Sequence, residues 1–378
     1  MRIAINAMFW QQPTVGSGQY LRGLVTALAA HAAQPQLTLI LPPSHSAPDD
    51  VPAHVECITA QLPTWLKAGL AKLYFEQLAV PQLAARLGAD VLHVPYFAAP
   101  LRSSLPIIVT ILDLIPLRLS AYRGRAQVRA YTHLVAQAAR QATQVLTISE
   151  HAAREIREHV HIPADRITVT PLAAGALFQP MDREHARAEV AKRYGIRSPF
   201  VYYVGGLDVR KNVPMLIRAF AHMRRAGGPK VTLVIAGQAL SNNPQLFPNI
   251  DALIAEEQAH EWIQRIQVPY SDGALLYNAA QVFAAPSRYE GFGLGPLEAM
   301  ACGTPVIAAQ ASSLPEVVGD AALCVPPDDS AAWTAALWRL LADAALREKL
   351  GQRGLQRAAQ FSYAHTANMT MNVYNQTQ

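Results

Sequence analysis

The chain alternates short apolar runs with longer segments in which apolar residues return at helical spacing. Runs such as Phe200-Val-Tyr-Tyr-Val204 predict buried strands, and the segments between such runs predict helices. This alternation continues along the whole chain and is typical of parallel sheets covered by helices. Two such sets, of roughly 170 residues each, suit two domains of ordinary size. The pattern therefore predicts an α/β protein with two doubly wound, Rossmann-like parallel sheets.

The predicted elements follow from this pattern. In the first half, strands are expected at 2–6, 37–41, 90–94, 106–110 and 144–148, and helices near 18–31, 66–87, 126–141 and 150–159. In the second half, strands are expected near 200–204, 231–236, 264–268, 281–285, 304–308 and 322–325, and helices near 212–226, 250–260, 272–279, 296–302 and 331–359. The loops with unusual residues follow strands, and ligands of open α/β sheets bind at that edge.

A change in composition marks the expected join between the domains. The strand-like Ile167-Thr-Val-Thr170 is followed by a stretch rich in proline, alanine and glycine, and then by a charged helical segment. We therefore expect a first domain at 1–178 and a second at 179–360. Residues 361–378 are expected to form a C-terminal helix.

The segment Ser287-Arg-Tyr-Glu-Gly-Phe-Gly-Leu-Gly-Pro-Leu-Glu298 combines a glycine-rich loop, two carboxylates and the start of a helix. Its glycines let the backbone approach a ligand closely, and Pro296 suits the first position of a helix, where N–H groups attract anions. Two carboxylates, Glu290 and Glu298, can bind beside an anionic group when the same ligand also carries many hydroxyls that donate hydrogen bonds to them. A nucleotide-sugar is such a ligand. The structural alternatives are helix capping by Glu298 and an exposed loop position for Glu290.

These residues resemble a known family. The spacing of Glu290 and Glu298 is similar to the E-x7-E motif of retaining glycosyltransferases with the GT-B fold, most of all to glycosyltransferase family 4. The resemblance continues in Ala299-Met-Ala-Cys-Gly-Thr-Pro-Val306, in Ser313-Leu-Pro-Glu-Val-Val-Gly-Asp320 and in Tyr203-Val-Gly-Gly-Leu-Asp-Val-Arg-Lys-Asn212. It implies two domains that face each other across a cleft, with the acceptor side in the first and the nucleotide-sugar donor side in the second. It also implies that the C-terminal helix crosses back to the first domain.

The resemblance places Lys211 at the leaving diphosphate, where negative charge builds in the transition state. Many relatives carry an arginine where this chain has Gly206, so Arg210 or loop N–H groups would take over part of this task. Glu290 would lie beside the donor sugar, and Glu298 would accept hydrogen bonds from the ribose hydroxyls. The sequence has no D-x-D triplet, and we expect neither a metal site nor a cofactor.

Further donor-binding positions are implied by the same resemblance. All of them lie in loops or at helix starts that follow predicted strands. They are Gly16, Gly18, Gly237, Val268, Tyr270, Phe292, Gly293 and Leu294. The first two would let the first domain close over the diphosphate, the next three would border the base, and the last three would offer backbone N–H groups to the sugar or the phosphates.

The segment Val109-Thr-Ile-Leu-Asp-Leu114 departs from the family, because many relatives have a histidine where this chain has Leu112. That histidine is commonly placed beside the donor sugar, and leucine cannot form its hydrogen bond. The change points to a donor without the corresponding hydroxyl, to another residue in that role or to a weakened enzyme. Asp113 could help the acceptor hydroxyl lose its proton, or it could cap a turn. His93 is a further candidate on the acceptor side, with an ordinary strand-end histidine as its alternative.

Composition limits the remaining classes. The chain has 378 residues, of which 51% are hydrophobic, and a net charge of +5. No run of about twenty apolar residues predicts a membrane-spanning helix. Three cysteines without C-x-x-C spacing favour a reducing cytoplasm. Nucleic-acid binding is not expected, because no motif accompanies the basic excess. That excess includes Arg118, Arg123, Arg125 and Arg129, a patch that suits either anionic lipid headgroups or a solvated face.

Residues 62–75 carry Trp65 and Leu70 beside Lys67 and Lys72. Such a segment could lie on a membrane surface and reach a lipid-linked acceptor. Packing of this helix on its own sheet is the favoured alternative. We therefore expect a cytoplasmic protein, with peripheral contact at the inner face of the membrane as an open option.

The sequence thus predicts a retaining, metal-independent glycosyltransferase. It would move a hexose of the mannose or glucose type from a GDP- or UDP-linked sugar to a glycan or glycolipid. Two alternatives with the same fold are a degenerate nucleotide-sugar-binding partner of an active transferase and a nucleotide-sugar epimerase. A dinucleotide-dependent oxidoreductase is disfavoured, because Leu21 stands where the third glycine of G-x-G-x-x-G would be.

Overall fold

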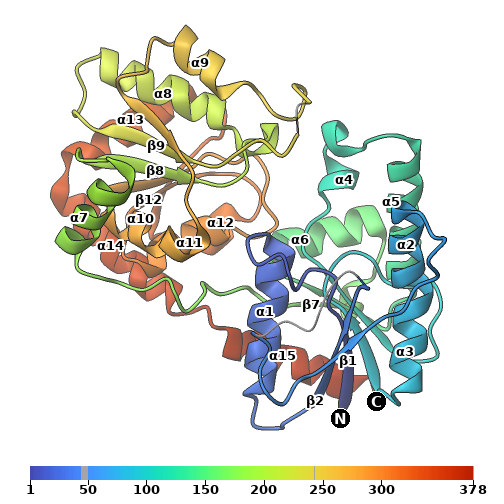
Figure 1. Cartoon of the computed structure of the whole chain (residues 1–378). Helices are drawn as coiled ribbons and strands as arrows, with labels where there is room; N and C mark the ends of the chain where they lie inside the picture. Colours follow the sequence, from blue (N-terminus) through green and yellow to red (C-terminus); the bar gives the residue numbers. More distant parts are fainter. Residues whose placement is uncertain (44–49, 242, 378) are drawn as a thin grey trace. The chain divides into compact units, whose positions relative to one another are not determined.

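The computed structural model describes residues 1–43, 50–241 and 243–377. The chain forms two compact units, Met1–Leu172 together with Ser362–Gln378, and Ala173–Phe361. We call them the N-terminal unit and the C-terminal unit. Each is built on a parallel sheet that helices cover (Figure 1).

The described part of the N-terminal unit contains a seven-stranded sheet in the order β3-β2-β1-β4-β5-β6-β7, and its pairings are parallel. Its strands are β1 (Arg2–Asn6), β2 (Gln36–Leu41), β3 (Glu56–Thr59), β4 (Val91–Val94), β5 (Ile107–Ile111), β6 (Gln144–Thr147) and β7 (Ile167–Val169). Its helices are α1 (Gly16–Ala29), α2 (Ala68–Tyr74), α3 (Val80–Arg86), α4 (Ile115–Arg118), α5 (Ala126–Gln141), α6 (Glu150–Glu155) and α15 (Tyr363–Gln376). A π-helical turn, Phe75–Ala79, joins α2 to α3.

The described part of the C-terminal unit contains a six-stranded parallel sheet in the order β10-β9-β8-β11-β12-β13. Its strands are β8 (Phe200–Val204), β9 (Thr232–Ala236), β10 (Ile263–Ile266), β11 (Val282–Ala285), β12 (Val306–Ala309) and β13 (Ala322–Val325). Its helices are α7 (Arg183–Tyr194), α8 (Val213–Arg225), α9 (Ile250–Glu256), α10 (Gly273–Ala279), α11 (Leu294–Ala301), α12 (Leu314–Val318), α13 (Ser330–Ala342) and α14 (Ala344–Ala358).

Each unit has an apolar core between its sheet and helices. In the C-terminal unit, α8 directs Leu216, Phe220 and Met223 into a cluster with alternate residues of the central strands. All three side chains are fully buried, and burying one of this size stabilises the fold by about 2 kcal/mol. The apolar periodicity of α8 therefore fixes which face of this helix covers the sheet.

The structure departs from the predicted elements in several places, among them the short helices α4 and α12, which were not predicted. The short edge strand β3 was not predicted, because its Glu56-Cys-Ile-Thr59 sequence is half-exposed and carries only a weak apolar signal. The helix expected at 331–359 is two helices, because the Asp343 side chain accepts a hydrogen bond from Leu346 N and starts α14. The helix expected from Pro296 begins at Leu294, with Gly293 as its N-cap, so Pro296 is its third residue.

The strand order of the C-terminal unit reverses between β8 and β11, which are neighbours in the sheet. The chain leaves these two strands in opposite directions along the sheet, and ligands of open α/β sheets bind at the carboxyl ends of strands at such a switch point. The loops after β8 and β11 carry Lys211 and Glu290. The topology therefore brings together two residues that are 79 positions apart.

Candidate active site

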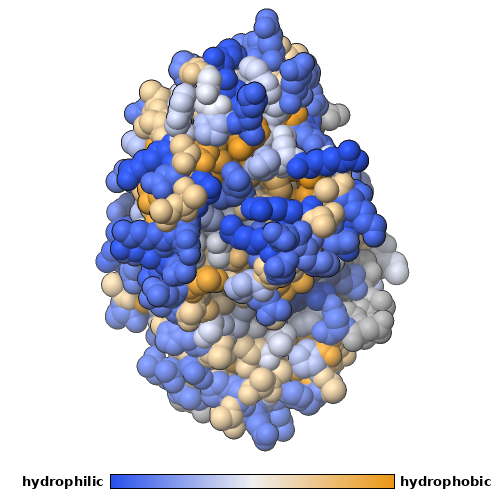
Figure 2. Space-filling view, turned by 90° about the vertical axis from the view of Figure 1, so that its left-hand side faces the viewer, coloured by the Kyte–Doolittle hydropathy of each residue, from blue (hydrophilic) through white to orange (hydrophobic). Residues whose placement is uncertain are grey.

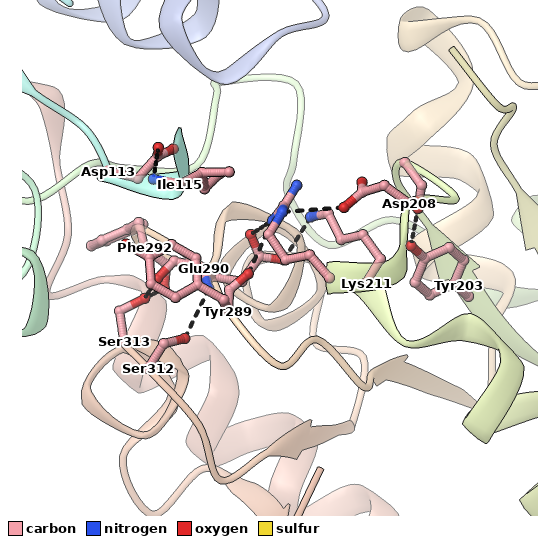
Figure 3. Close-up of polar contacts among 12 residues, drawn as sticks. Asp113, Ile115, Tyr203, Asp208, Lys211, Tyr289, Glu290, Phe292, Ser312 and Ser313 are labelled. Atoms are coloured by element: carbon pink, nitrogen blue, oxygen red, sulfur yellow. Dashed lines mark hydrogen bonds and ion pairs between the residues drawn. The ribbon is translucent and has the colours of Figure 1, made fainter. Parts of the chain in front are cut away.

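Two cations and two carboxylates meet at the switch point of the C-terminal unit. Lys211 Nζ lies 2.5 Å from Glu290 Oε1, and Arg210 Nη1 lies 2.8 Å from Glu290 Oε2 (Figure 3). The same arginine lies 3.3 Å from Asp208 through Nε and donates to the Tyr289 carbonyl at 3.0 Å. Charge is therefore balanced within the cluster before any ligand binds.

The Glu290 carboxylate is only 16% exposed, yet it stays ionised. Burial alone raises the pKa of such a group, but the charges of Lys211 and Arg210 outweigh it and lower the pKa of Glu290 to about 2. Glu290 is thus a permanent anion at neutral pH.

Backbone contacts hold the loop that carries Glu290. Glu290 N donates to Ser312 Oγ at 2.9 Å, and Ser313 Oγ donates to the carbonyls of Glu290 and Phe292 (Figure 3). Gly293 follows with φ +127°, a conformation that L side chains rarely adopt. The glycine of the E-x7-E loop is therefore needed for the turn into α11.

Glu298 lies on the second turn of α11 and is 8% exposed. Its Oε2 accepts a hydrogen bond from the Tyr277 hydroxyl at 2.9 Å. Burial raises the pKa of Glu298 to about 7, and the Tyr277 hydrogen bond opposes this rise. Because Glu298 is the fifth residue of α11, the capping alternative considered for its sequence position does not apply.

Glycines allow a close approach of the strand ends on the other side of the switch point. Gly205 has φ +149° and Gly237 has φ +155°. A Cβ on Gly237 would lie 2.1 Å from the Gly205 carbonyl oxygen, so only glycine fits there. The Gly206 carbonyl accepts from the Tyr203 hydroxyl at 2.5 Å, which fixes the turn that leads to Arg210.

The remaining candidates for donor binding in the C-terminal unit differ in how exposed their side chains are. Tyr270 is 38% exposed and packs edge-on against Phe178, and Val268 is half-buried. Phe292 is buried and packs edge-on against Phe361, so its backbone rather than its ring could serve a ligand. Leu294 is the first residue of α11. Their contacts with a donor stay predictions.

In the N-terminal unit, Gly16 and Gly18 lie in the first turn of α1. A Cβ on Gly16 would meet nothing within 4 Å, whereas one on Gly18 would lie 2.0 Å from the Gln12 carbonyl oxygen. Gly18 therefore has a packing reason of its own, because the preceding loop lies directly against the helix. Gly16 has open space, which leaves it free for the predicted approach of a ligand.

Asp113 follows β5 and forms a local turn. Its Oδ1 accepts from Ile115 N at 3.1 Å (Figure 3), as expected for a turn-capping aspartate. The neighbouring Leu112 is half-buried. The proposed proton-accepting role of Asp113 stays a prediction beside this local role.

His93 is fully buried inside the N-terminal unit. Its Nδ1 lies 2.6 Å from the Tyr374 hydroxyl of α15, and its Nε2 lies 2.8 Å from Thr110 Oγ1. Burial lowers its pKa to about 3, so the ring is neutral. Nδ1 thus links β4 to the last helix and Nε2 links β4 to β5, so both ring nitrogens have structural partners, which favours the structural alternative for this residue.

Three residues with a role in the site geometry received no role from the sequence. Asp208 supports Arg210, and Ser312 and Ser313 hold the Glu290 loop. Ser313 and Asp208 lie within the motifs that carry the family resemblance, which was the available signal. Within the described ranges, no group of three or more His, Cys, Asp or Glu side chains could hold a metal ion.

Comparison with known proteins assigns these motifs to a family. Residues 186–357 match the family described as glycosyl transferases group 1, and residues 15–173 match that described as Glycosyltransferase Family 4. The chain is 32% identical over 285 residues to the O-antigen chain mannosyltransferase B of Escherichia coli, which covers 75% of this chain and 74% of that protein. The chain belongs to glycosyltransferase family 4. This glycosyltransferase is a hexosyltransferase with the GT-B fold.

A longer relative agrees with that assignment, and solved structures agree with its fold. A 31% identity to the serotype-specific mannosyltransferase WbdA of Escherichia coli covers 68% of this glycosyltransferase but only 32% of WbdA. A sucrose-phosphate synthase from Thermosynechococcus elongatus matches with a TM-score of 0.80 and 25% identity, over 100% of this chain and 98% of that one. The Anabaena protein HepE in complex with UDP and glucose matches in fold, with a TM-score of 0.77, 18% identity and 99% coverage of both chains.

Proposed function

We propose that this protein is a retaining, metal-independent enzyme that transfers a hexose from a nucleoside-diphosphate sugar to a glycan or glycolipid. The observation that carries the proposal is the cluster of Arg210, Lys211 and Glu290 at the switch point of the C-terminal unit. The names of the Escherichia coli relatives support mannose as the hexose. The HepE structure in complex with UDP-glucose supports a UDP-linked glucose as the second choice.

The two cations supply the positive charge that a leaving diphosphate needs. Lys211 and Arg210 are paired with Glu290. Fixed cations in a partly buried site stabilise developing negative charge more strongly than they would in water. A diphosphate bound here would share both cations with Glu290, which would then face the sugar ring.

Glu298 serves the ribose in this proposal. Its carboxylate is buried on the second turn of α11, and the Tyr277 hydroxyl donates a hydrogen bond to it. An ionised carboxylate accepts strong hydrogen bonds from two vicinal hydroxyls. The raised pKa of Glu298 therefore makes donor binding depend on pH near neutrality.

Retention follows if the acceptor hydroxyl attacks from the face that the diphosphate leaves. The bond between the anomeric carbon and the diphosphate oxygen breaks, and a bond to the acceptor oxygen forms on the same face. The acceptor proton passes to the departing diphosphate oxygen. Double displacement is the competing path: Glu290 first displaces the diphosphate from the anomeric carbon, the acceptor oxygen then displaces Glu290, and Asp113 would take the acceptor proton.

The N-terminal unit offers a surface for a lipid-linked acceptor. Trp65 is 77% exposed and Leu70 is 55% exposed, beside the exposed Lys67. Exposed tryptophan and leucine with nearby lysines suit the interface of an anionic bilayer. Among the described residues, no helix combines the length and the apolar character needed to cross a membrane. In co-sedimentation with anionic vesicles, we expect the wild type to appear in the vesicle pellet and Trp65→Ser to stay in the supernatant. Trp338→Ser, a control in the C-terminal unit, should sediment like the wild type.

A thermal-shift screen in EDTA tests the central proposal. GDP, UDP and their mannose and glucose conjugates would be compared on the wild type, on Lys211→Ala and on Lys230→Ala, an exposed control lysine of the same unit. A nucleotide at about 100 times its dissociation constant adds about 2.7 kcal/mol to stability. We expect one base to stabilise the wild type and the control, and Lys211→Ala to respond far less.

The outcomes separate the alternatives. No shift with any nucleotide would remove the nucleotide-sugar proposal. Binding followed by transfer, with the product anomer read by NMR, would establish retention or inversion. Binding without hydrolysis or transfer would indicate a degenerate binding partner, and donor conversion without an acceptor would indicate an epimerase.

A further inference from the structure

The C-terminal unit has a second concave site at the edge of its sheet that is opposite to Lys211 and Glu290. Its lining comes from α7, from α14 and from residues that precede β11 and β12, including Gln281 and Gly303. Because these strands are parallel, their amino ends lie at one edge and the donor loops lie at the other. The cavity measures about 380 Å³, within the range of pockets that hold small organic ligands.

Helices α7 and α14 lie near each other on the left of Figure 1. Figure 2 faces that side, and strongly hydrophilic side chains gather across the middle of the view. Arg187 is exposed on α7, and Glu348 and Gln352 are exposed on α14. The pocket is therefore lined in large part by polar side chains.

Three arginines give this pocket its charge. Arg183 and Arg187 lie one turn apart on α7, and Arg347 lies in the first turn of α14. Arg183 Nη2 donates to the Gly303 carbonyl at 3.1 Å, and Arg347 Nη1 donates to two carbonyls of the last turn of α13 at 2.8 and 2.6 Å. The described partners of Arg183 and Arg347 are thus neutral carbonyl groups, and the pocket lining holds three arginines against one carboxylate, Glu348, which leaves an excess of positive charge.

Several other arginines of the C-terminal unit form ion pairs with carboxylates. These pairs include Arg193–Glu189, Arg225–Glu257 and Arg353–Asp320. In the part of the chain that the structure describes, none of the three pocket arginines has such an ion pair. Burial, followed by the charges of Arg187 and Arg347, lowers the pKa of Arg183, which shows that like charges act on one another here. An excess of positive charge in a concave site attracts anions.

We propose that this arginine pocket binds a phosphorylated sugar. Guanidinium groups match phosphate oxygens in geometry and charge. The remaining polar lining residues, Gln281, Glu348 and Gln352, offer acceptors and donors for sugar hydroxyls. A bare phosphate would leave much of the cavity and this polar lining unused. The site is separate from the donor loops, so it does not rest on the proposed transferase mechanism.

Titration calorimetry of the full chain with mannose 6-phosphate tests the proposal, with inorganic phosphate and unphosphorylated mannose as comparison ligands. The test variants are Arg187→Ala and Arg347→Ala, and the matched control is Arg353→Ala, on the same helix as Arg347. Arg183 is left unchanged, because its hydrogen bond holds Gly303 at the end of α11. Loss of one charged hydrogen-bonding partner should weaken binding about tenfold.

Support requires that mannose 6-phosphate bind the wild type and Arg353→Ala alike, bind more tightly than either comparison ligand, and bind about tenfold more weakly to both test variants. A matching unfolding temperature for all four proteins would show that each is folded. Absence of binding, or binding that ignores Arg187 and Arg347, would overturn the proposal. Binding that is lost in Lys211→Ala instead would place the ligand in the donor site and would also overturn it.

Discussion

Replacing Glu298 with glutamine should stabilise the protein at alkaline pH while it weakens donor binding. The side chain is 8% exposed, and burial raises its pKa from 4.5 to about 7. Between these two values the folded state binds more protons than the unfolded state. Stability therefore falls as pH rises through this window, and the loss is complete above pH 7.

The size of the effect follows from the shift. One pKa unit corresponds to about 1.36 kcal/mol, so the raised pKa of Glu298 lowers the free energy of unfolding by about 3 kcal/mol at pH 8.5 and by about 1 kcal/mol at pH 5. Glutamine has a similar shape, carries no charge and can still accept from Tyr277 through its carbonyl oxygen. Glu298→Gln should therefore gain about 2 kcal/mol relative to the wild type when the pH is raised from 5 to 8.5.

Urea unfolding at the two pH values measures this gain, with Glu256→Gln as a control at an exposed position of the same unit. The control should show no pH-dependent difference of this size. Calorimetry with the nucleoside diphosphate at pH 8.5 should show a loss of about tenfold in affinity for Glu298→Gln. Equal pH dependence in the wild type and the variant would refute the raised pKa, and unchanged affinity would refute the ribose contact.

Three further outcomes are expected. Glu290→Gln should lower turnover more than donor affinity. The lost anion is expected to act on the reacting sugar, whereas Lys211 stays available for the phosphates. A change confined to KM would contradict this. The pKa of the buried His93 ring is about 3, against 6.5 in the unfolded chain, so the protein loses stability as the pH falls through this window. His93→Gln removes this contribution and should reduce the rise of the unfolding free energy between pH 4 and 6. An unchanged slope would argue against the lowered pKa. Gly237→Ala should lower both unfolding temperature and donor affinity, because its Cβ would overlap the Gly205 carbonyl; a wild-type melting curve would speak against this contact.

The apolar pattern predicted both units and most of their strands, because strands buried on two faces are almost continuously apolar. It missed β3, since an edge strand with half-exposed residues lacks that signal. It also joined α13 to α14, because the helical periodicity continues across the junction and only the capping role of Asp343 interrupts it. Local patterns thus predicted the layers better than the exact breaks between elements.

The site was predictable to the extent that its residues lie in contiguous motifs. Glu290, Glu298 and Lys211 lie in such motifs, and the switch between β8 and β11 brings Lys211 and Glu290 into contact. The partners of His93 could not be predicted, because Tyr374 is 281 residues away and reaches it only through the packing of α15. The support that Ser312 gives to the Glu290 loop likewise depends on tertiary structure.

The two glutamates of the E-x7-E motif reach opposite protonation behaviour through their surroundings. Glu290 precedes the turn at Gly293 and faces Lys211 and Arg210, so its pKa falls to about 2. Glu298 follows the turn, lies buried on α11 and receives a hydrogen bond from a neutral hydroxyl, so its pKa rises to about 7. Environments that separate the pKa values of two neighbouring acids also separate their tasks. For the proposed transfer we therefore expect Glu290 to act as a fixed anion for the reacting sugar and Glu298 to exchange its proton for hydrogen bonds when the nucleotide binds.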